Sequence, residues 1–285
     1  EYTDPEILRT NLASVILQMA TSGLGEIRHF PFLEAPDRRQ VNDGYKLLEE
    51  LSAVDDKRRV TRLGRTMARL PLDPRLARML VTSAEQGSLA EVLIVIAGLS
   101  VQDPRERPQD KQQAADQAHA PFNDKESDFA TLLNIWNWFE EQRQELSQNQ
   151  LKKLCQKTFL SWMRMREWRD IHRQLTLICR EQKLTLNSQP ANYDAVHKAI
   201  LAGLLGQVAV KVEKREYLAT RNRKVMIFPG SKVGKTAPKW IVAAEIVETS
   251  KVFARMVAAI QPEWVEPLAG HVVKHHYFEP HWEQK

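Results

Sequence analysis

Basic side chains concentrate in two parts of this chain, where they could pair with a polymer of negative charge. Residues 150–180 carry a net charge of +6 and residues 198–260 carry +8, whereas the rest of the 285-residue chain carries −9. Such segregation is typical of proteins that bind nucleic acid, although long charged side chains can also simply solvate helix faces. The candidate contacts are Arg164, Arg166, Arg169, Arg221, Arg223, Lys224, Lys232, Lys235 and Lys239.

Three of these arginines lie in residues 157–170, where basic residues alternate with large aromatics. Aromatic rings can stack on bases while arginines bind phosphates. The rings also recur at helical spacing, and Arg166 and Asp170 are placed for an i,i+4 ion pair. We therefore expect the aromatics to be core residues and keep the three arginines as candidate nucleic-acid contacts. The aromatics are Phe159, Trp162 and Trp168.

The segment Gly230–Thr236 combines glycines, lysines and a final Lys-Thr pair, as a phosphate-binding loop would. The Walker pattern has four residues between its glycines, and here there are three. Pro238 and the strand-like residues 240–244 leave no room for the helix that must follow. We predict instead a mobile basic loop between two strands, whose lysines contact a nucleic-acid backbone.

No constellation of catalytic residues or metal ligands stands out. Four histidines lie near the end of the chain at spacings of four or five, but without a cysteine or carboxylate framework they are weak zinc ligands. We therefore expect no catalytic residue, metal or cofactor in this segment. The histidines are His271, His275, His276 and His281.

The length allows two or three domains of roughly 100–150 residues each. No apolar run approaches the ~20 residues of a membrane span, so we expect no membrane partner. The only cysteines, Cys155 and Cys179, match no zinc or redox spacing, which favours a cytoplasmic location. Because the sequence starts at Glu1 without a methionine, we expect a fragment of a longer chain.

The first 70 residues have the pattern of a winged helix. Apolar periodicity predicts helices over residues 5–22, closed by Gly23, and over residues 40–51. Residues 53–62 place two extended arms around an Asp-Asp-Lys turn, which indicates a small hairpin.

The next stretch, residues 63–80, predicts two short helices separated by a turn. Leu63, Met67 and Leu70 recur on one helical face. Pro71 then interrupts the helix, and Asp73 is placed to cap a second helix that has Pro74 at its first position.

From there to about residue 190 the period is helical, and afterwards it becomes that of strands. Residues 80–99 are rich in Ala, Leu and Ile, and we predict helices at residues 111–120, 128–146, 150–182 and 193–205. Five short strands should follow and form a small barrel, at residues 208–212, 217–220, 224–228, 240–244 and 252–255. The fold class is thus multi-domain and mainly α, followed by a small all-β barrel.

Several blocks resemble the DEAH-box RNA helicases. Residues 5–12 resemble the opening of the winged helix that follows the second RecA-like domain in that family. Residues 63–80 resemble its junction with the helical ratchet domain. Residues 126–136 resemble the ratchet pattern in which Gly-Asp-His is usual, although Ser127 and Phe129 depart from it.

The resemblance continues to the end of the chain. Residues 159–175 resemble the next ratchet block, with Met163 where many members are basic, and this departure weakens an RNA contact there. Residues 240–245 and 259–264 resemble the family's OB-fold. The tail, residues 275–282, resembles the extension of bacterial HrpA-type helicases. The implied domains are a winged helix (1–70), a ratchet (71–190), an OB-fold (191–270) and an extension (271–285).

The resemblance implies an accessory region of an ATP-dependent 3′-to-5′ RNA helicase. ATP and Mg²⁺ would bind to the RecA-like pair, whose motifs this chain lacks, so alone it should not hydrolyse ATP. The implied partners are single-stranded RNA and the RecA-like core, and a ribosome or ribonucleoprotein is a further one.

Two other functions fit parts of the sequence. The basic faces could dock on a protein partner or on the helicase core, which would make the chain a scaffold. A winged-helix DNA regulator is disfavoured, because the second helix carries acidic residues beside Lys46. These are Asp43, Glu49 and Glu50.

Overall fold

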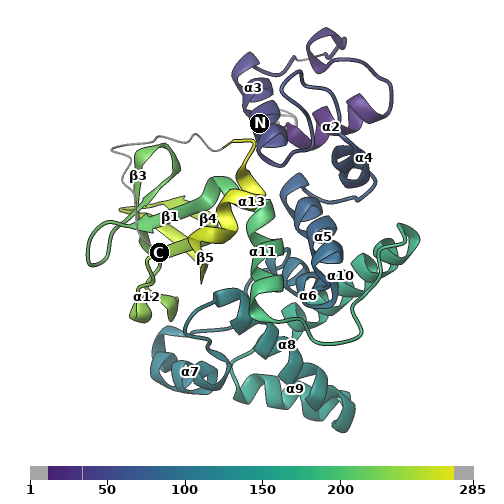
Figure 1. Ribbon diagram of the computed structural model, residues 1–285. Coiled ribbons are helices and arrows are strands. Elements are labelled where there is room, and N and C mark those ends of the chain that lie inside the picture. The colour runs from purple at the N-terminus through teal and green to yellow at the C-terminus, as the bar shows by residue number, and fades with distance from the viewer. Residues whose placement is uncertain (1–11, 34, 273–285) are drawn as a thin grey trace, which may run out of the picture.

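The computed structural model describes residues 12–33 and 35–272. Figure 1 shows three parts: a small helical unit at the N-terminal end, a larger helical body, and a barrel beside that body. The small unit contains α2 (Ala13–Thr21), the turn η1 (Ile27–His29), α3 (Arg38–Glu50) and α4 (Arg62–Ala68). The predicted helix over residues 5–22 is confirmed from Ala13 onward, and its beginning lies outside the described residues.

Local signals account for these helices. Gly23 lies beyond the end of α2 with a φ of 73°, a left-handed conformation that glycine adopts without strain. Asp37 begins α3 as part of a capping box with Gln40. The predicted inward residues of this helix, Tyr45, Leu47 and Leu48, are buried.

The predicted hairpin at residues 53–62 is reduced to a single antiparallel bridge between Val54 and Val60. The Asp55 carboxylate accepts the backbone N–H of Lys57 at 3.0 Å and of Arg59 at 2.8 Å, which closes the chain tightly. Backbone hydrogen bonds from Asp55 to Arg59 and from Thr61 to Ala53 flank the bridge, so the arms pair only over this short distance around an Asx-type turn.

The helical body contains α5 (Pro74–Gln86), α6 (Leu89–Leu99), α7 (Gln112–His119), α8 (Asp128–Glu145), α9 (Gln148–Lys157), α10 (Trp162–Glu181) and α11 (Tyr193–Gly203), with the turns η2 (Gln109–Lys111) and η3 (Ala120–Phe122). The predicted start of α5 is confirmed: the Asp73 side chain accepts the N–H of Arg75, and Pro74 is the first helical residue. Met67 and Leu70 of the preceding segment are buried as predicted, and Leu63 packs beside them.

The prediction of one long helix over residues 150–182 was wrong. The chain breaks after α9, where Phe159 has a φ of 53° and Leu160 forms a bridge with Arg105. The Ala-, Leu- and Ile-rich run Leu80–Leu99 spans parts of two helices, because Gly87 ends α5 in a left-handed conformation with a φ of 65°. In the first case a long-range backbone pairing overrides a helical sequence pattern.

Large side chains at helical spacing form the core of the body, as predicted for Trp168. This ring is fully buried, and its Nε1–H donates to the Ile94 carbonyl at 2.9 Å. Phe159 and Trp162 are half-buried. The predicted ion pair between Arg166 and Asp170 is absent from the described part of the chain.

The barrel contains β1 (Val208–Lys211), β2 (Tyr217–Ala219), β3 (Arg223–Ile227), β4 (Trp240–Glu248) and β5 (Val252–Ala259), and the turns η4 (Leu205–Gln207) and η5 (Thr220–Asn222). Its closed order is β1-β2-β3-β5-β4, in which only β3 and β5 run parallel. The fold class is therefore confirmed: mainly α, followed by a small five-stranded barrel of OB-fold type.

Strand alternation gives the barrel two buried faces. Ile241 and Ala243 point into its own small core, whereas Val242 between them belongs to the core of the helical body. Ala258 on β5 does the same. After the strands come η6 (Pro262–Trp264) and α13 (Val265–Ala269), which lies beside α11 (Figure 1). None of the helices that the structure describes could cross a bilayer.

Glycine permits the closest helix approach in the body. A Cβ on Gly203 of α11 would lie 2.4 Å from the Arg75 carbonyl oxygen of α5. We predict that Gly203→Ala lowers the free energy of unfolding by about 1–3 kcal/mol, because backbone must move to admit the methyl group. Urea unfolding measures this. Gly234→Ala is the control, since its Cβ would meet Ile227 at an ordinary 3.6 Å, and an equal loss there would contradict the packing argument.

Candidate nucleic-acid interface

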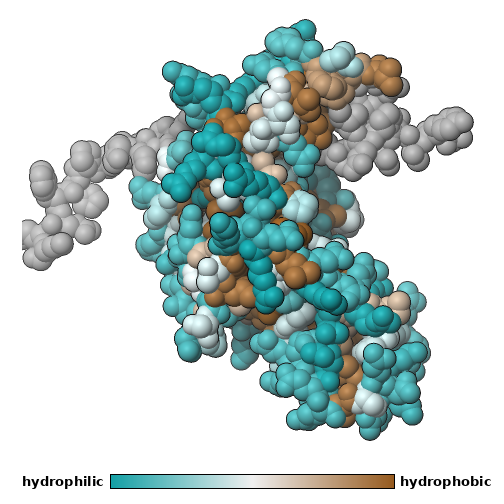
Figure 2. Space-filling view, turned by 90° about the vertical axis from the view of Figure 1, so that its right-hand side faces the viewer, coloured by the Kyte–Doolittle hydropathy of each residue, from teal (hydrophilic) through white to brown (hydrophobic). Residues whose placement is uncertain are grey.

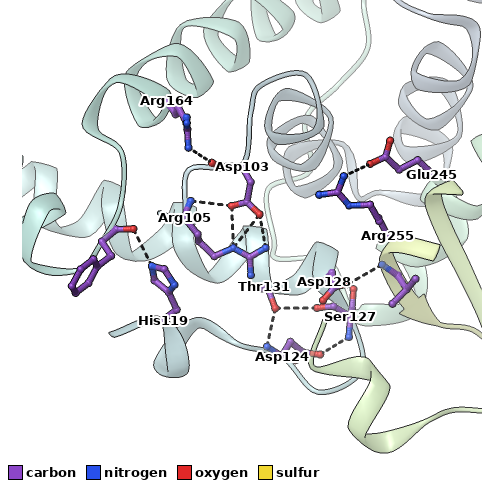
Figure 3. Close-up of polar contacts among 12 residues, drawn as sticks. Asp103, Arg105, His119, Asp124, Ser127, Asp128, Thr131, Arg164, Glu245 and Arg255 are labelled. Carbon is purple, nitrogen blue, oxygen red and sulfur yellow. Dashed lines mark hydrogen bonds and ion pairs between the residues drawn. The ribbon is translucent and has the colours of Figure 1, made fainter. Parts of the chain in front are cut away.

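The helical body and the barrel are joined by backbone pairing rather than by side chains alone. The N–H of Ala259 donates to the Glu126 carbonyl at 2.7 Å, and Ser127 forms an antiparallel bridge with Ala258. Next along, the N–H of Val257 donates to the Asp128 carboxylate at 2.9 Å (Figure 3). The segment that leads into α8 therefore extends the barrel sheet at β5, and the two parts hold one relative orientation.

A buried histidine completes this junction. His197 of α11 has its Nδ1 at 2.8 Å from the Tyr193 carbonyl, which can only accept, so Nδ1 carries the proton. Its Nε2 then accepts the hydroxyl proton of Ser127 at 2.6 Å. The same Ser127 oxygen accepts the N–H of Ala130 and caps α8. Burial lowers the pKa of His197 to about 4, so the ring is neutral near pH 7.

Charged groups line the edge of this junction (Figure 3). Asp103 and Arg105 form a bidentate ion pair, with the closest approach at 2.7 Å. Burial pushes the pKa of Asp103 upward, but the hydrogen bonds and charge of Arg105 outweigh it and hold that pKa below its usual range. Burial raises the pKa of Asp128. Arg164 donates to the Asp103 carbonyl at 2.9 Å.

The glycine- and lysine-rich segment forms a loop between β3 and β4, as predicted, but it contains a helical turn, α12 (Val233–Thr236). Val233 is fully buried in the barrel core. The Thr236 hydroxyl donates to the Lys125 carbonyl at 3.1 Å, and the Tyr217 hydroxyl donates to the Pro238 carbonyl at 2.9 Å. These contacts hold the loop backbone to both the barrel and the helical body.

The lysines of this loop differ in their surroundings. Lys235 and Lys239 are exposed, whereas Lys232 is half-buried. The charge of Lys232 also acts on Asp116 of α7, whose pKa is lowered mainly by its hydrogen bond from Arg107. Figure 1 shows the α12 turn beside α7 at the lower edge of the barrel.

The other barrel candidates lie on β3 and the turn before it. Arg223 pairs with Glu248 at 2.8 Å, and Lys224 pairs with Glu216 at 3.0 Å. Arg221 is exposed and adopts a left-handed conformation with a φ of 59°. An ion pair at the surface is weak and can exchange for a phosphate, so pairing leaves these residues available.

The three α10 arginines do not form one cluster. Because a helix turns about 100° per residue, Arg164 and Arg166 point about 160° apart. Arg164 faces the Asp103 loop, whereas Arg169 pairs with Glu140 of α8 at 2.7 Å. Arg166 is exposed. The structure brings only Arg164 toward the junction with the barrel.

One aromatic site on the barrel was missing from the sequence prediction. The ring of Phe228 is 39% exposed at the start of the lysine loop and meets Phe253 edge-on, with ring centroids 5.8 Å apart. The Arg255 guanidinium lies 4.9 Å from the Phe228 centroid, and Arg255 also pairs with Glu245. An aromatic directly before a basic Gly/Lys loop was the available signal.

The C-terminal histidines can be judged only at His271, because the other three lie outside the described residues. His271 Nε2 lies 2.8 Å from the Glu50 carbonyl, so it links the end of the described residues to α3. No group of three or more metal-ligand side chains gathers within residues 12–33 and 35–272.

Three known domain families match successive parts of the chain. The helicase-associated winged-helix domain (HA2) matches residues 45–72, the ratchet-like HA2 domain matches residues 73–132, and the oligonucleotide/oligosaccharide-binding (OB)-fold matches residues 196–272.

Two relatives match almost the whole chain. The ATP-dependent RNA helicase HrpA homolog of Haemophilus influenzae is 52% identical over 290 residues, which cover 99% of this chain. The ATP-dependent RNA helicase HrpA of Escherichia coli is 51% identical over 290 residues, which cover 100% of it. This chain belongs to the accessory region of HrpA-type DEAH-box helicases. It spans about a fifth of the length of these relatives, 22% of each.

The structure explains how this HrpA-type region accommodates its departures from the Gly-Asp-His pattern. Ser127, in the glycine position, caps α8 and bonds to His197. Phe129, in the histidine position, is fully buried, with its ring centroid 6.3 Å from that of His197. Asp128 keeps the aspartate and accepts the β5 backbone N–H. Both departures thus fall in the body–barrel junction.

We predict that the His197 network makes the stability of this region depend on pH. The unfolded chain binds a proton at His197 near pH 6.5, whereas the folded chain does so only near pH 4. Stability is therefore lost as pH falls through this window, at up to about 1.4 kcal/mol per pH unit from this residue. The free energy of unfolding, measured in urea from about pH 7.5 to about pH 4.5, should fall less steeply in His197→Gln than in the wild type. Identical slopes would contradict the burial of a neutral imidazole.

Proposed function

We propose that this region is the RNA-binding accessory module of an ATP-dependent 3′-to-5′ RNA helicase. In this proposal it guides single-stranded RNA past a RecA-like motor that lies in the rest of the parent protein, where ATP and Mg²⁺ bind. The names of both relatives, ATP-dependent RNA helicases, support it. The observation that carries it is the lysine loop of the barrel, whose backbone is anchored while Lys235 and Lys239 face solvent.

Anchoring matters because binding costs free energy when a flexible loop must become ordered. The burial of Val233 and the hydrogen bonds of Thr236 and Pro238 meet that cost during folding. The lysines then present charge from a fixed backbone, which suits recognition of phosphates without regard to sequence.

Phe228 and Arg255 would add a second kind of contact. The exposed part of the Phe228 ring and the Arg255 guanidinium over it form an aromatic and cationic surface at the start of the lysine loop. Bases of a single strand stack on such surfaces with little dependence on sequence. Phosphates on the lysines and a base on this pair would fix the path of the strand across the barrel.

The division into winged helix (1–70), ratchet (71–190), OB-fold (191–270) and extension (271–285) is part of the proposal. The motor would be the first partner, and a ribosome or ribonucleoprotein a further one. Because α11 packs mainly on α5, and the β5 end pairs with Glu126 and Ser127, ratchet and barrel would act on RNA as one body.

Removal of two loop lysines should weaken electrostatic RNA binding. We predict that Lys232→Ala with Lys235→Ala lowers the log–log salt slope for single-stranded RNA by up to about 1.4, roughly 0.7 per phosphate contact. Fluorescence anisotropy at several salt concentrations measures this. Lys152→Ala with Lys153→Ala removes equal charge from exposed positions of α9 and should leave the slope unchanged. Loss for one RNA sequence alone would contradict backbone recognition.

Replacement of Phe228 should weaken contacts with the bases of the RNA rather than with its phosphates. We predict that Phe228→Leu, which keeps apolar volume, weakens binding of single-stranded RNA by about 1–3 kcal/mol without altering the salt slope. The same titration with an abasic strand should show no difference between Phe228→Leu and the wild type. An equal loss on the abasic strand would mean that Phe228 only supports the loop.

A further inference from the structure

A groove lies between α8 and α10, away from the lysine loop. Its volume is about 470 Å³, and its walls include Arg169, Arg173, Leu177 and Arg180 of α10. Figure 1 shows α10 on the right of the molecule and α12 at the lower left, so the groove and the loop lie on different sides. Figure 2 faces this right-hand side, where hydrophobic surface shows between strongly hydrophilic side chains.

The arginines follow one stripe of the helix. Arg166, Arg173 and Arg180 are spaced by seven residues, which returns them to nearly the same face over about 20 Å. All three are exposed, and none has a partner within the described residues. Arg169 lies on the same side but is already paired with Glu140, which also binds Arg143 at 2.9 Å.

Apolar groups interrupt and underlie the stripe. Leu177 lies between Arg173 and Arg180 on the helix, is 48% exposed and lines the groove with them. The floor is formed by Trp136 and His172, whose rings lie 4.6 Å apart. Burial lowers the pKa of His172, so this floor is neutral near pH 7.

This combination fits a polypeptide better than an RNA strand. Glu140 is already paired with Arg143 and Arg169, so Arg173 and Arg180 leave the groove basic, but a phosphate backbone makes no use of Leu177. An amphipathic helix laid in the groove would place carboxylates one or two turns apart against the arginines and an apolar side chain against Leu177. Charge complementarity therefore selects an acidic helix with an apolar centre.

We propose that the α8–α10 groove is a docking site for an acidic amphipathic helix of a protein partner, separate from the RNA path over the barrel. The arginines at heptad spacing recognise its carboxylates, and Leu177 with the Trp136–His172 floor receives its apolar residue. This inference is independent of RNA binding by the lysine loop.

Phage display tests it without a known partner. Random peptides of about 16 residues, long enough to form a helix, are selected on the wild-type chain. Peptides that also bind the double variant Arg173→Glu with Arg180→Glu are then discarded. We expect enrichment of sequences with Asp or Glu at spacings of three, four or seven around a large apolar residue. Selection of no such sequence would overturn the proposal.

A fluorescein-labelled copy of the most enriched peptide is then titrated by anisotropy. The double arginine reversal should weaken binding by about tenfold or more, since two exposed ion pairs are lost and repulsion replaces them. Leu177→Ser should also weaken it. Lys152→Glu with Lys153→Glu, the matched charge reversal on α9, and Lys232→Ala with Lys235→Ala should leave it unchanged.

Competition with oligouridine distinguishes a peptide-binding groove from a second RNA-binding site. If RNA displaces the peptide, and RNA affinity falls on arginine reversal but not in Leu177→Ser, the groove is a second RNA site and the proposal is wrong. If the peptide binds all variants equally, it does not use the groove, and the proposal also fails. Circular dichroism of each variant ensures that losses arise in folded protein.

Discussion

The pairing of the Glu126–Ser127 backbone and the Asp128 carboxylate with the end of β5 is the constraint on which the rest of the structure depends. It converts a helical body and a barrel, each with its own apolar residues, into one unit with a shared core. The Ser127–His197 hydrogen bond seals this junction, because both groups are buried and each satisfies the other. A buried polar pair is costly to separate, so the orientation is strongly specified.

Glu50 links the small N-terminal helical unit to the rest of the structure. Its carboxylate accepts the Gly206 N–H at 2.8 Å and pairs with Arg75 at 3.4 Å, while its carbonyl meets His271. The last residue of α3 thus contacts the first turn of α5, the entrance to the barrel and the end of the described chain. The winged helix is held by these polar contacts in addition to the common apolar core.

A rigid unit of this shape separates its charged surfaces. The lysine loop lies at the lower edge of the barrel, and α10, which carries the arginine stripe, lies on the right of the molecule (Figure 1). The two basic blocks look alike in the sequence but have different neighbours in the structure. One lies beside Phe228 and Arg255 on the barrel, and the other lies beside Glu140 and Leu177. Charge alone does not define a binding partner, whereas the neighbouring groups do.

The sequence by itself determined what depends on neighbours along the chain: the Asp73–Pro74 helix start, the apolar face of α3, the five strands and the mainly α then β order. It also identified the basic loop. Only the tertiary structure decided the break at Phe159, the His197–Ser127 bond, the exposure of Phe228 and the opposite directions of Arg164 and Arg166. Each depends on contacts between residues far apart in sequence or on helix phase against distant elements, and local periodicity does not encode either.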